Sequence, residues 1–442
     1  MSIKDKAVGF TKKFKLDSHH AIERFGVFFG VLAVTGMFVL GGSVASAWEN
    51  GRATLTETAL YTDSFTTSKT KLEGKVEGVY RNELGNKTLV MMNFGETSKI
   101  SYNAEDYEAF LLGSRTDLKT EKVSTSGIKG TFHVFGSTGY MGVILEADQP
   151  FDRQVLNLTM RANAELSFKD EQASGGDADA LAGDASFAKH DQWRVFFNPG
   201  ASGAKHIEAL DTAVFDPARA YYDIVLKGDE AKVRDMLDSK LVEMRADLNK
   251  IKAYSSDLQT TKVDGLFLRP PTVPEAIRED TITGMTKDEV PSSANAQTRA
   301  DAGLTLNTDH TVPRGLDFDW RAGNVYDGYL NKLVPSGGSY AKFLADKNTE
   351  PQDDVGADIS NLPWLLSDGT DLKKDYTASD VTVRPLTNVM NNLSQAYRDY
   401  YTHKTEYQTD LLFQLLDLDV ELRNVQSNSS IREDADFLVT LY

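Results

Sequence analysis

The residues of this sequence that could act as catalysts or metal ligands include seven histidines. A metal site needs ligands at short, recurring spacings, and a hydrolase needs a nucleophile beside its base. The histidines are scattered, apart from the adjacent pair His19 and His20, which we interpret as polar side chains preceding an apolar run. His133 is followed by Ser137, but the G-x-S-x-G pattern of a serine hydrolase is absent. We therefore expect no catalytic residue, no cofactor and no metal site.

Carboxylate pairs are the second kind of candidate chemistry, because two carboxylates can share the acid and base roles of glycoside hydrolysis. The sequence contains two close pairs, Asp317 with Asp319 and Asp417 with Asp419. In a chain with 65 acidic residues such pairs also arise by chance. We interpret both pairs as chance neighbours and not as an acid and its base.

Calcium is the metal that a run of acidic residues suggests first. The stretch DFDWRAGNVYDG begins like an EF-hand loop, but Arg321 and Ala322 occupy positions that require an oxygen ligand and a glycine. A second acidic run lies in a segment rich in Gly and Ala and contains Asp177, Asp179 and Asp184. We interpret this run as a solvated loop, so neither stretch predicts a calcium site.

Composition excludes further classes of chemistry. The chain has no cysteine, which rules out disulfides, thiolate nucleophiles and cysteine zinc sites. Its formal net charge is −17, although residues 1–47 hold six basic and three acidic residues. An acidic body repels phosphate backbones, so we expect no nucleic-acid partner. The basic residues 1–24 suit the anionic inner face of a membrane and are interpreted as a cytoplasmic head.

An uncharged run of 24 residues, 25–48, follows this head. Its length predicts a transmembrane helix with the amino terminus inside and the bulk of the chain outside a bacterial cytoplasmic membrane. The sequence Ala45-Ser46-Ala47 leaves open a signal-peptidase cut, which would still export the body. Gly26 and Gly30 form a G-x-x-x-G step that favours membrane helix association. The expected partners are the lipid bilayer, other envelope proteins and copies of the chain itself.

Period-two patterns dominate the next part of the chain. Residues 49–68 are rich in Ser and Thr and predict a stalk, and residues 69–215 predict an extracellular β-rich domain resembling an antiparallel sandwich. Residues 71–94 read as a β-hairpin around a loop containing Gly. Residues 104–113 read as a short helix or a strand edge.

Helical patterns follow. Asp216-Pro217 starts a helical hairpin or coiled coil over residues 216–262, with a second helix from Asp229. Its apolar seam consists of Leu237, Leu241, Met244, Leu248, Ile251 and Leu258. Residues 263–383 form an irregular, loop-rich region, and residues 384–442 a long helix and tail. The interaction seam of that helix contains Leu386, Met390, Leu393, Tyr397, Tyr407, Leu411, Leu415, Leu418 and Leu422.

These elements predict an α+β chain with one amino-terminal transmembrane helix, a β-sandwich-like domain, and long coiled-coil-type helices with a loop-rich region. The layout is similar to that of single-pass proteins in Gram-positive secretion and conjugation machines. We therefore expect a non-catalytic, single-pass scaffold of a bacterial cell-envelope assembly. The alternative is a membrane-anchored protein that binds or hydrolyses cell-wall polymers, with a cleft formed by residues 310–330 and 360–370.

Overall fold

The computed structural model describes residues 61–95, 97, 100–114, 125–162, 190–297, 302–351, 355–377 and 380–441. The chain divides into two compact units, which we call the β unit and the helical unit. The β unit comprises Met1–Phe132, Met141–Leu210 and Ile431–Tyr442, and the helical unit comprises His133–Tyr140 and Asp211–Ser430.

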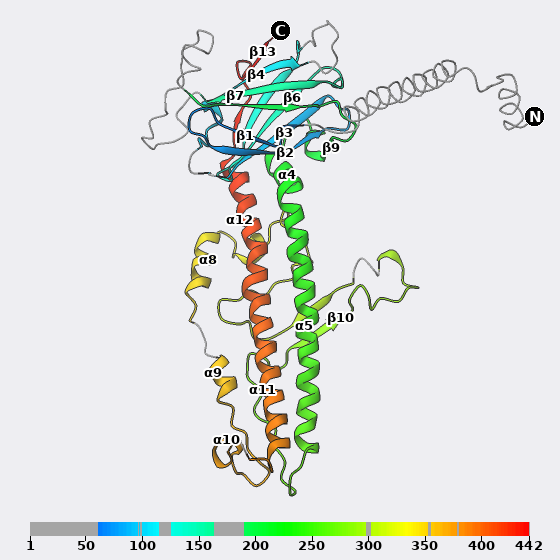
Figure 1. Ribbon diagram of the computed structural model, residues 1–442, viewed down its shortest axis with the longest axis vertical. Coiled ribbons are helices and arrows are strands. Elements are labelled where there is room, and N and C mark those ends of the chain that lie inside the picture. Colours follow the sequence, from blue (N-terminus) through cyan, green and yellow to red (C-terminus); the bar gives the residue numbers. More distant parts are fainter. Residues whose placement is uncertain are drawn as a thin grey trace, which may run out of the picture. The chain divides into compact units, whose positions relative to one another are not determined.

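The β unit contains two mainly antiparallel sheets (Figure 1). The first sheet has the strand order β1 (Ser64–Thr66), β2 (Glu73–Arg81), β3 (Lys87–Phe94), β6 (Tyr140–Glu146), β5 (Lys129–Val134) and β12 (Ser430–Arg432), with β9 (Lys205–His206) parallel to β2. The second has the order β13 (Leu438–Leu441), β4 (Tyr107–Ser114), β7 (Val155–Ala162) and β8 (Gln192–Phe197), with β13 parallel to β4.

Aromatic rings fill the space between the two sheets. Trp193 on β8 stacks on Phe65 of β1, with 5.8 Å between the ring centroids. It contacts Phe94 of β3 edge-on, with 5.3 Å between the ring centroids. Phe132 on β5 stacks on Phe437 at 5.5 Å. Inward and outward residues alternate along β8, as a strand with one buried face requires. The β unit is thus held by an apolar core between two sheet faces.

The strand predictions are mostly confirmed. The β2–β3 hairpin forms with a register shift at Val76/Gly78. The interpretation of residues 104–113 as a short helix or strand edge is wrong. Only Ala104–Asp106 form a short helical turn, and β4 then runs between β13 and β7 inside the second sheet. Leu and Ala in this segment favour helix, but pairing on both sides overrides that local preference.

The helical unit is built on two long, antiparallel helices that pack together (Figure 1). One consists of α4 (Pro217–Tyr221), the π-helical turn η5 (Tyr222–Leu226) and α5 (Lys227–Thr260). The other consists of α11 (Arg384–Thr405), the π-helical turn η6 (Glu406–Leu411) and α12 (Leu412–Asn428). The two apolar seams suggest that these helices pack together or onto copies of themselves, and in the structure they pack on each other, with Leu248 and Ile251 of the predicted seam half-buried.

The first helix begins where the sequence predicts, because the Asp216 side chain accepts hydrogen bonds from the backbone N–H groups of Ala218 and Arg219. The prediction of a separate second helix from Asp229 is wrong. The turn η5 carries the helix through this point without a break, and α5 begins at Lys227.

The π-helical turns also change which residues are buried. Each inserts one residue into the helical period and rotates the following stripe. In the carboxy-terminal helix Leu415 and Leu422 are buried as part of the predicted seam, whereas Leu418 is half-buried. Leu412 and Leu416, which the seam omits, are buried. The heptad pattern therefore places the helix correctly but misses part of its buried face.

Residues 263–383 are here called the connecting segment, and the elements that the structure describes in it are short. They include β10 (Thr281–Gly284), β11 (Leu304–Asn307), α7 (Leu330–Leu333), α8 (Tyr340–Thr349), α9 (Val355–Ser360) and α10 (Leu372–Asp375). Trp320 and Trp364 in this segment are buried. The segment is therefore packed as part of the helical unit.

The predicted single-pass topology is contradicted. Over the residues that the structure describes, no helix is both long enough and apolar enough to cross a bilayer. The long helices carry charges such as Asp229 and Glu230 between their apolar positions, whereas a span needs about 20 mostly apolar residues. This finding also contradicts three related predictions. They are the fold class with a transmembrane helix, the extracellular placement and the membrane location. The predicted span 25–48, with Gly26 and Gly30, lies outside the described residues.

Candidate functional site

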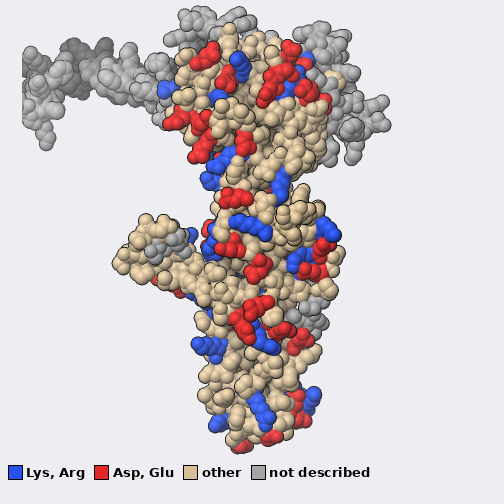
Figure 2. Space-filling model, turned by 180° about the vertical axis from the view of Figure 1, so that it is seen from behind, with Lys and Arg blue, Asp and Glu red and all other residues tan. Residues whose placement is uncertain are grey.

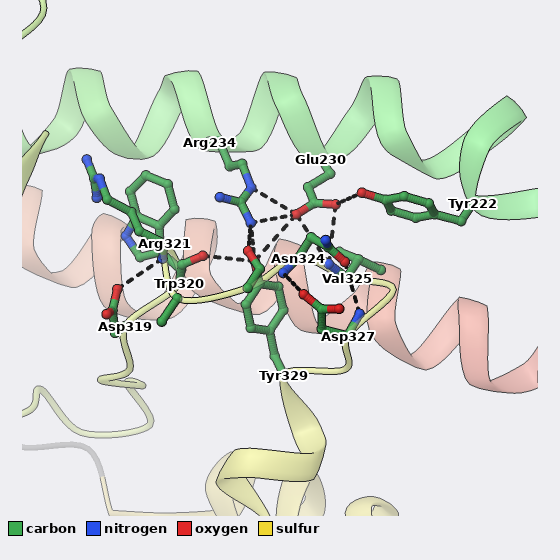
Figure 3. A network of polar contacts seen from close by, with 12 residues as sticks. Tyr222, Glu230, Arg234, Asp319, Trp320, Arg321, Asn324, Val325, Asp327 and Tyr329 are labelled. Atoms are coloured by element: carbon green, nitrogen blue, oxygen red, sulfur yellow. Dashed lines mark hydrogen bonds and ion pairs between the residues drawn. The ribbon is translucent and has the colours of Figure 1, made fainter. Parts of the chain in front are cut away.

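A buried glutamate links the connecting segment to α5 (Figure 3). Glu230 is 3% exposed. Its carboxylate accepts hydrogen bonds from the Tyr222 hydroxyl at 3.0 Å, from Arg234 Nε at 2.8 Å and from the backbone N–H of Val325 at 3.2 and 3.3 Å. The Tyr329 hydroxyl contacts the same carboxylate at 3.4 Å. Burial, followed by the charge of Glu230, raises the pKa of Tyr222, so this hydroxyl stays protonated and donates.

Trp320 lies beside this cluster and joins it to the second helix. Its indole Nε1–H donates to the Tyr407 hydroxyl at 2.9 Å, and its carbonyl oxygen accepts from the Tyr329 hydroxyl at 2.9 Å. The Arg321 guanidinium covers the indole ring at 3.8 Å from its centroid. Burial raises the pKa of Tyr407 to about 12. The loop from Trp320 to Tyr329 is thus held by both long helices.

A second buried cluster surrounds Lys404 of α11, whose side chain is fully buried. Its Nζ donates to the Ala276 carbonyl at 2.8 Å, to Asp280 Oδ2 at 2.7 Å and to Thr308 Oγ1 at 2.9 Å. The Tyr400 hydroxyl also donates to Asp280 Oδ2, at 2.7 Å. Burial lowers the pKa of Lys404, and Asp280 opposes that shift. All three ammonium protons are therefore engaged with the connecting segment.

A third contact lies on α12. Asp419 Oδ2 accepts from the backbone N–H of Leu330 at 2.7 Å, and Asp419 Oδ1 accepts from Arg423 Nε at 3.0 Å. The beginning of α7 is thereby fixed to the second helix.

These three clusters hold the connecting segment on the two long helices. Their charges are buried and directed at each other or at backbone groups. Within the described residues, no group of three or more His, Asp or Glu side chains could hold a metal ion.

Several of the polar residues considered as candidates in the sequence are hydrogen-bonded within the protein. The Asp319 side chain accepts a hydrogen bond from the backbone N–H of Arg321 in its own turn. The Asp419 side chain accepts hydrogen bonds from the backbone N–H of Leu330 and from Arg423. Ser137 accepts a hydrogen bond from the Asn424 side-chain amide at 2.8 Å. The acidic run at positions 177, 179 and 184 and the pair at positions 19 and 20 lie outside the described residues.

Two tryptophans of residues 310–330 and 360–370, the ranges considered for a polymer cleft, are in the interior. Trp320 and Trp364 are 3% and 0% exposed. Their ring faces are covered by the helical unit and are not presented to an external chain.

His133 predicts a pH dependence of stability. Burial lowers its pKa to about 4, and its ring lies 4.7 Å from that of Phe215. The unfolded chain binds the proton more readily between pH 6.5 and 4, so the free energy of unfolding falls as pH falls through this window. Well above pH 6.5 the imidazole is neutral in both states and contributes no slope.

We expect urea unfolding of the parent to lose about 2 kcal/mol more between pH 7 and pH 5 than unfolding of His133→Leu. The variant lacks the titrating group, so the difference isolates His133 from the carboxylates that titrate nearby in pH. Parallel pH profiles for the two proteins would contradict the assignment.

An open groove lies between α5 and the π-helical turn η6, and we call it the α5–η6 groove. It has a volume of about 520 Å³. Its lining includes Asp235, Met236, Lys240 and Glu243 of α5 and Glu406, Asp410 and Leu411 of η6. Carboxylates outnumber the ammonium group four to one, and Met236 is 43% exposed. This groove combines acidic walls with an exposed apolar side chain.

Sequence reasoning missed both the clusters and the groove. Residues such as Glu230 and Lys404 resemble ordinary charged positions of a helix, and their partners in the connecting segment, Val325 and Asp280, are 95 and 124 residues away along the chain. An interruption in the heptad seam near Tyr407 was the one available signal, because it marks the π-helical turn that lines the groove. No family model, no curated protein and no solved structure matches this chain.

Proposed function

We propose that the protein is a non-catalytic scaffold, in which the helical unit serves as a stiff element that other proteins bind. The observation that carries this proposal is the use of buried charge. Lys404, Glu230 and Asp419 each hold a backbone group of the connecting segment. Groups that an enzyme would direct at a substrate are here directed at the chain itself.

Stiffness follows from the same contacts. Buried polar groups that are hydrogen-bonded to one another restrict the arrangement of the segments that they join. The long helices also bury an apolar seam between them, with Leu237, Leu241 and Leu393 inaccessible to solvent. A helix of 34 residues such as α5 extends about 51 Å. Such a helix spans a long distance and presents a defined surface to other proteins.

Complementation of a deletion strain tests the non-catalytic part. Asp317→Asn combined with Asp319→Asn should restore the parent phenotype within about threefold, because neither carboxylate does chemistry. A folded double variant that fails to complement would show that these carboxylates are catalytic and would overturn the proposal.

Gentle isolation of the tagged full-length chain tests the scaffold part. The chain should elute in a complex of fixed composition, and tagging the partner should return this chain in the same ratio. A chain that is monomeric in both experiments would overturn the scaffold assignment.

A further inference from the structure

We propose that the α5–η6 groove binds a basic amphipathic segment of a partner protein. The inference rests on the scaffold function proposed above and names the chemistry of one partner. It is carried by the shape, charge and apolar content of a single surface.

The charge of the groove is unbalanced even after its internal ion pairs form. Lys240 Nζ lies 2.6 Å from Glu243 and 2.8 Å from Glu406, and so bridges α5 to η6. The carboxylates of Asp235 and Asp410 are the remaining acidic groups of the lining. A ligand that brings cations therefore meets carboxylates on both walls.

The groove also offers apolar contact. Met236 leaves 43% of its surface to solvent and lies in the same lining as Leu411. Methionine adapts its shape to different partners, which makes it common on surfaces that bind amphipathic helices. From Asp235 to Glu243 the groove follows α5 for about 12 Å, or two helical turns. This length accommodates one or two apolar side chains flanked by basic ones.

The π-helical turn explains why the groove occurs at this place. A π-helical turn releases a backbone carbonyl from its usual helical partner. The Gln408 carbonyl accepts from the backbone N–H of Leu316 at 3.0 Å, and Gln408 Oε1 accepts from the backbone N–H of Val312 at 2.9 Å. The inward residues of η6 thus hold the connecting segment, while Glu406 and Asp410 of the same turn line the groove.

Charge favours a basic partner over the other possible occupants. A second copy brings a net charge of −17 and the same acidic groove, so self-association pairs like charges. Nucleic acid carries phosphates and is repelled. The molecular face in Figure 2 shows acidic and basic side chains intermixed, so net charge alone does not define a binding surface. The acidic excess within one groove is a local feature.

The probe for this site is a synthetic peptide of about 18 residues made of Leu and Lys, with leucines at helical spacing. A matched peptide has Glu in place of every Lys. The chain has no cysteine, so Ser239→Cys places one thiol in the groove of the full-length protein. Ser256→Cys places one thiol on the same helix outside the groove lining. Each thiol carries an environment-sensitive fluorophore.

The Lys peptide should change the fluorescence at position 239 in a saturable way and leave position 256 unchanged. Asp235→Asn combined with Asp410→Asn should weaken binding about fivefold or more at low salt, since each exposed ion pair contributes modestly. The control Asp257→Asn with Asp288→Asn removes the same charge elsewhere and should change binding less than about twofold. Salt should weaken binding of the parent.

Equal binding of the Lys and Glu peptides, or equal loss in the groove and control variants, would overturn the groove assignment. So would a concentration-dependent rise in mass that the groove variants abolish, because the occupant would then be a second copy. None of these results bears on the complementation and co-isolation experiments. The proposal that the groove binds a basic segment can therefore be wrong while the proposed scaffold function is still correct.

Discussion

Lys404→Met is expected to destabilise the helical unit by about 3–5 kcal/mol, because it leaves a buried carboxylate without its cation. Methionine retains the length of the side chain, so the change removes charge and donors with little loss of packing. The Oδ2 atom of Asp280 would then lose the Lys404 ammonium and keep the Tyr400 hydroxyl. The Ala276 carbonyl and the Thr308 hydroxyl would lose the ammonium as well.

Hydrogen exchange under increasing urea measures this effect region by region. That readout suits a chain with two compact units, where one global transition is not assured. Lys232→Met is the matched control, since the Lys232 side chain is 75% exposed and its pair with Asp229 is worth less than about 1 kcal/mol. Similar losses in the two variants would show that the Lys404 pair is not desolvated.

A second variant separates the loss of the ion pair from the cost of leaving the Asp280 carboxylate buried and unpaired. Lys404→Met combined with Asp280→Asn contains no buried charge at this place, so it should be more stable than Lys404→Met alone by about 1–2 kcal/mol. Asparagine still offers an oxygen to Tyr400. A double variant less stable than either single variant would contradict a desolvation cost at Asp280.

Local features of the sequence predict part of this fold, and distant pairing decides the rest. The start of the first helix follows from Asp216-Pro217, since a cap and a proline act within one turn. The β2–β3 hairpin follows from alternation around a short loop. The segment that became β4 carries Leu and Ala, so only its neighbours β13 and β7 make it a strand.

The candidate site was less predictable because its residues are unremarkable in sequence. Asp235 and Glu406 are spaced like solvent-exposed charges on their helices, and nothing local indicates that they share one groove. The heptad pattern predicts that the helices pair, but the phase of η6 decides which acidic residues face α5. The Glu230 cluster depends on Val325, which lies in a segment without a periodic pattern.

Glu230→Ala is expected to lower the free energy of unfolding of the helical unit by about 2–4 kcal/mol. The backbone N–H of Val325 is buried and would lose its acceptor. The Arg234 guanidinium would lose its carboxylate and keep the Gly323 carbonyl at 2.5 Å and the Tyr329 hydroxyl. The cost arises from polar groups left without partners more than from the loss of one ion pair.

The change should also release the loop from Trp320 to Tyr329, so its amides should exchange faster than those of α11. Glu230→Gln keeps an acceptor oxygen but removes the negative charge beside Arg234, and should cost about half as much as Glu230→Ala. Asp229→Ala is the matched control one residue earlier. Its side chain is 53% exposed, and its loss should cost less than about 1 kcal/mol. If exchange in the loop were equally fast in Asp229→Ala and Glu230→Ala, the buried carboxylate would not be what holds the loop on α5.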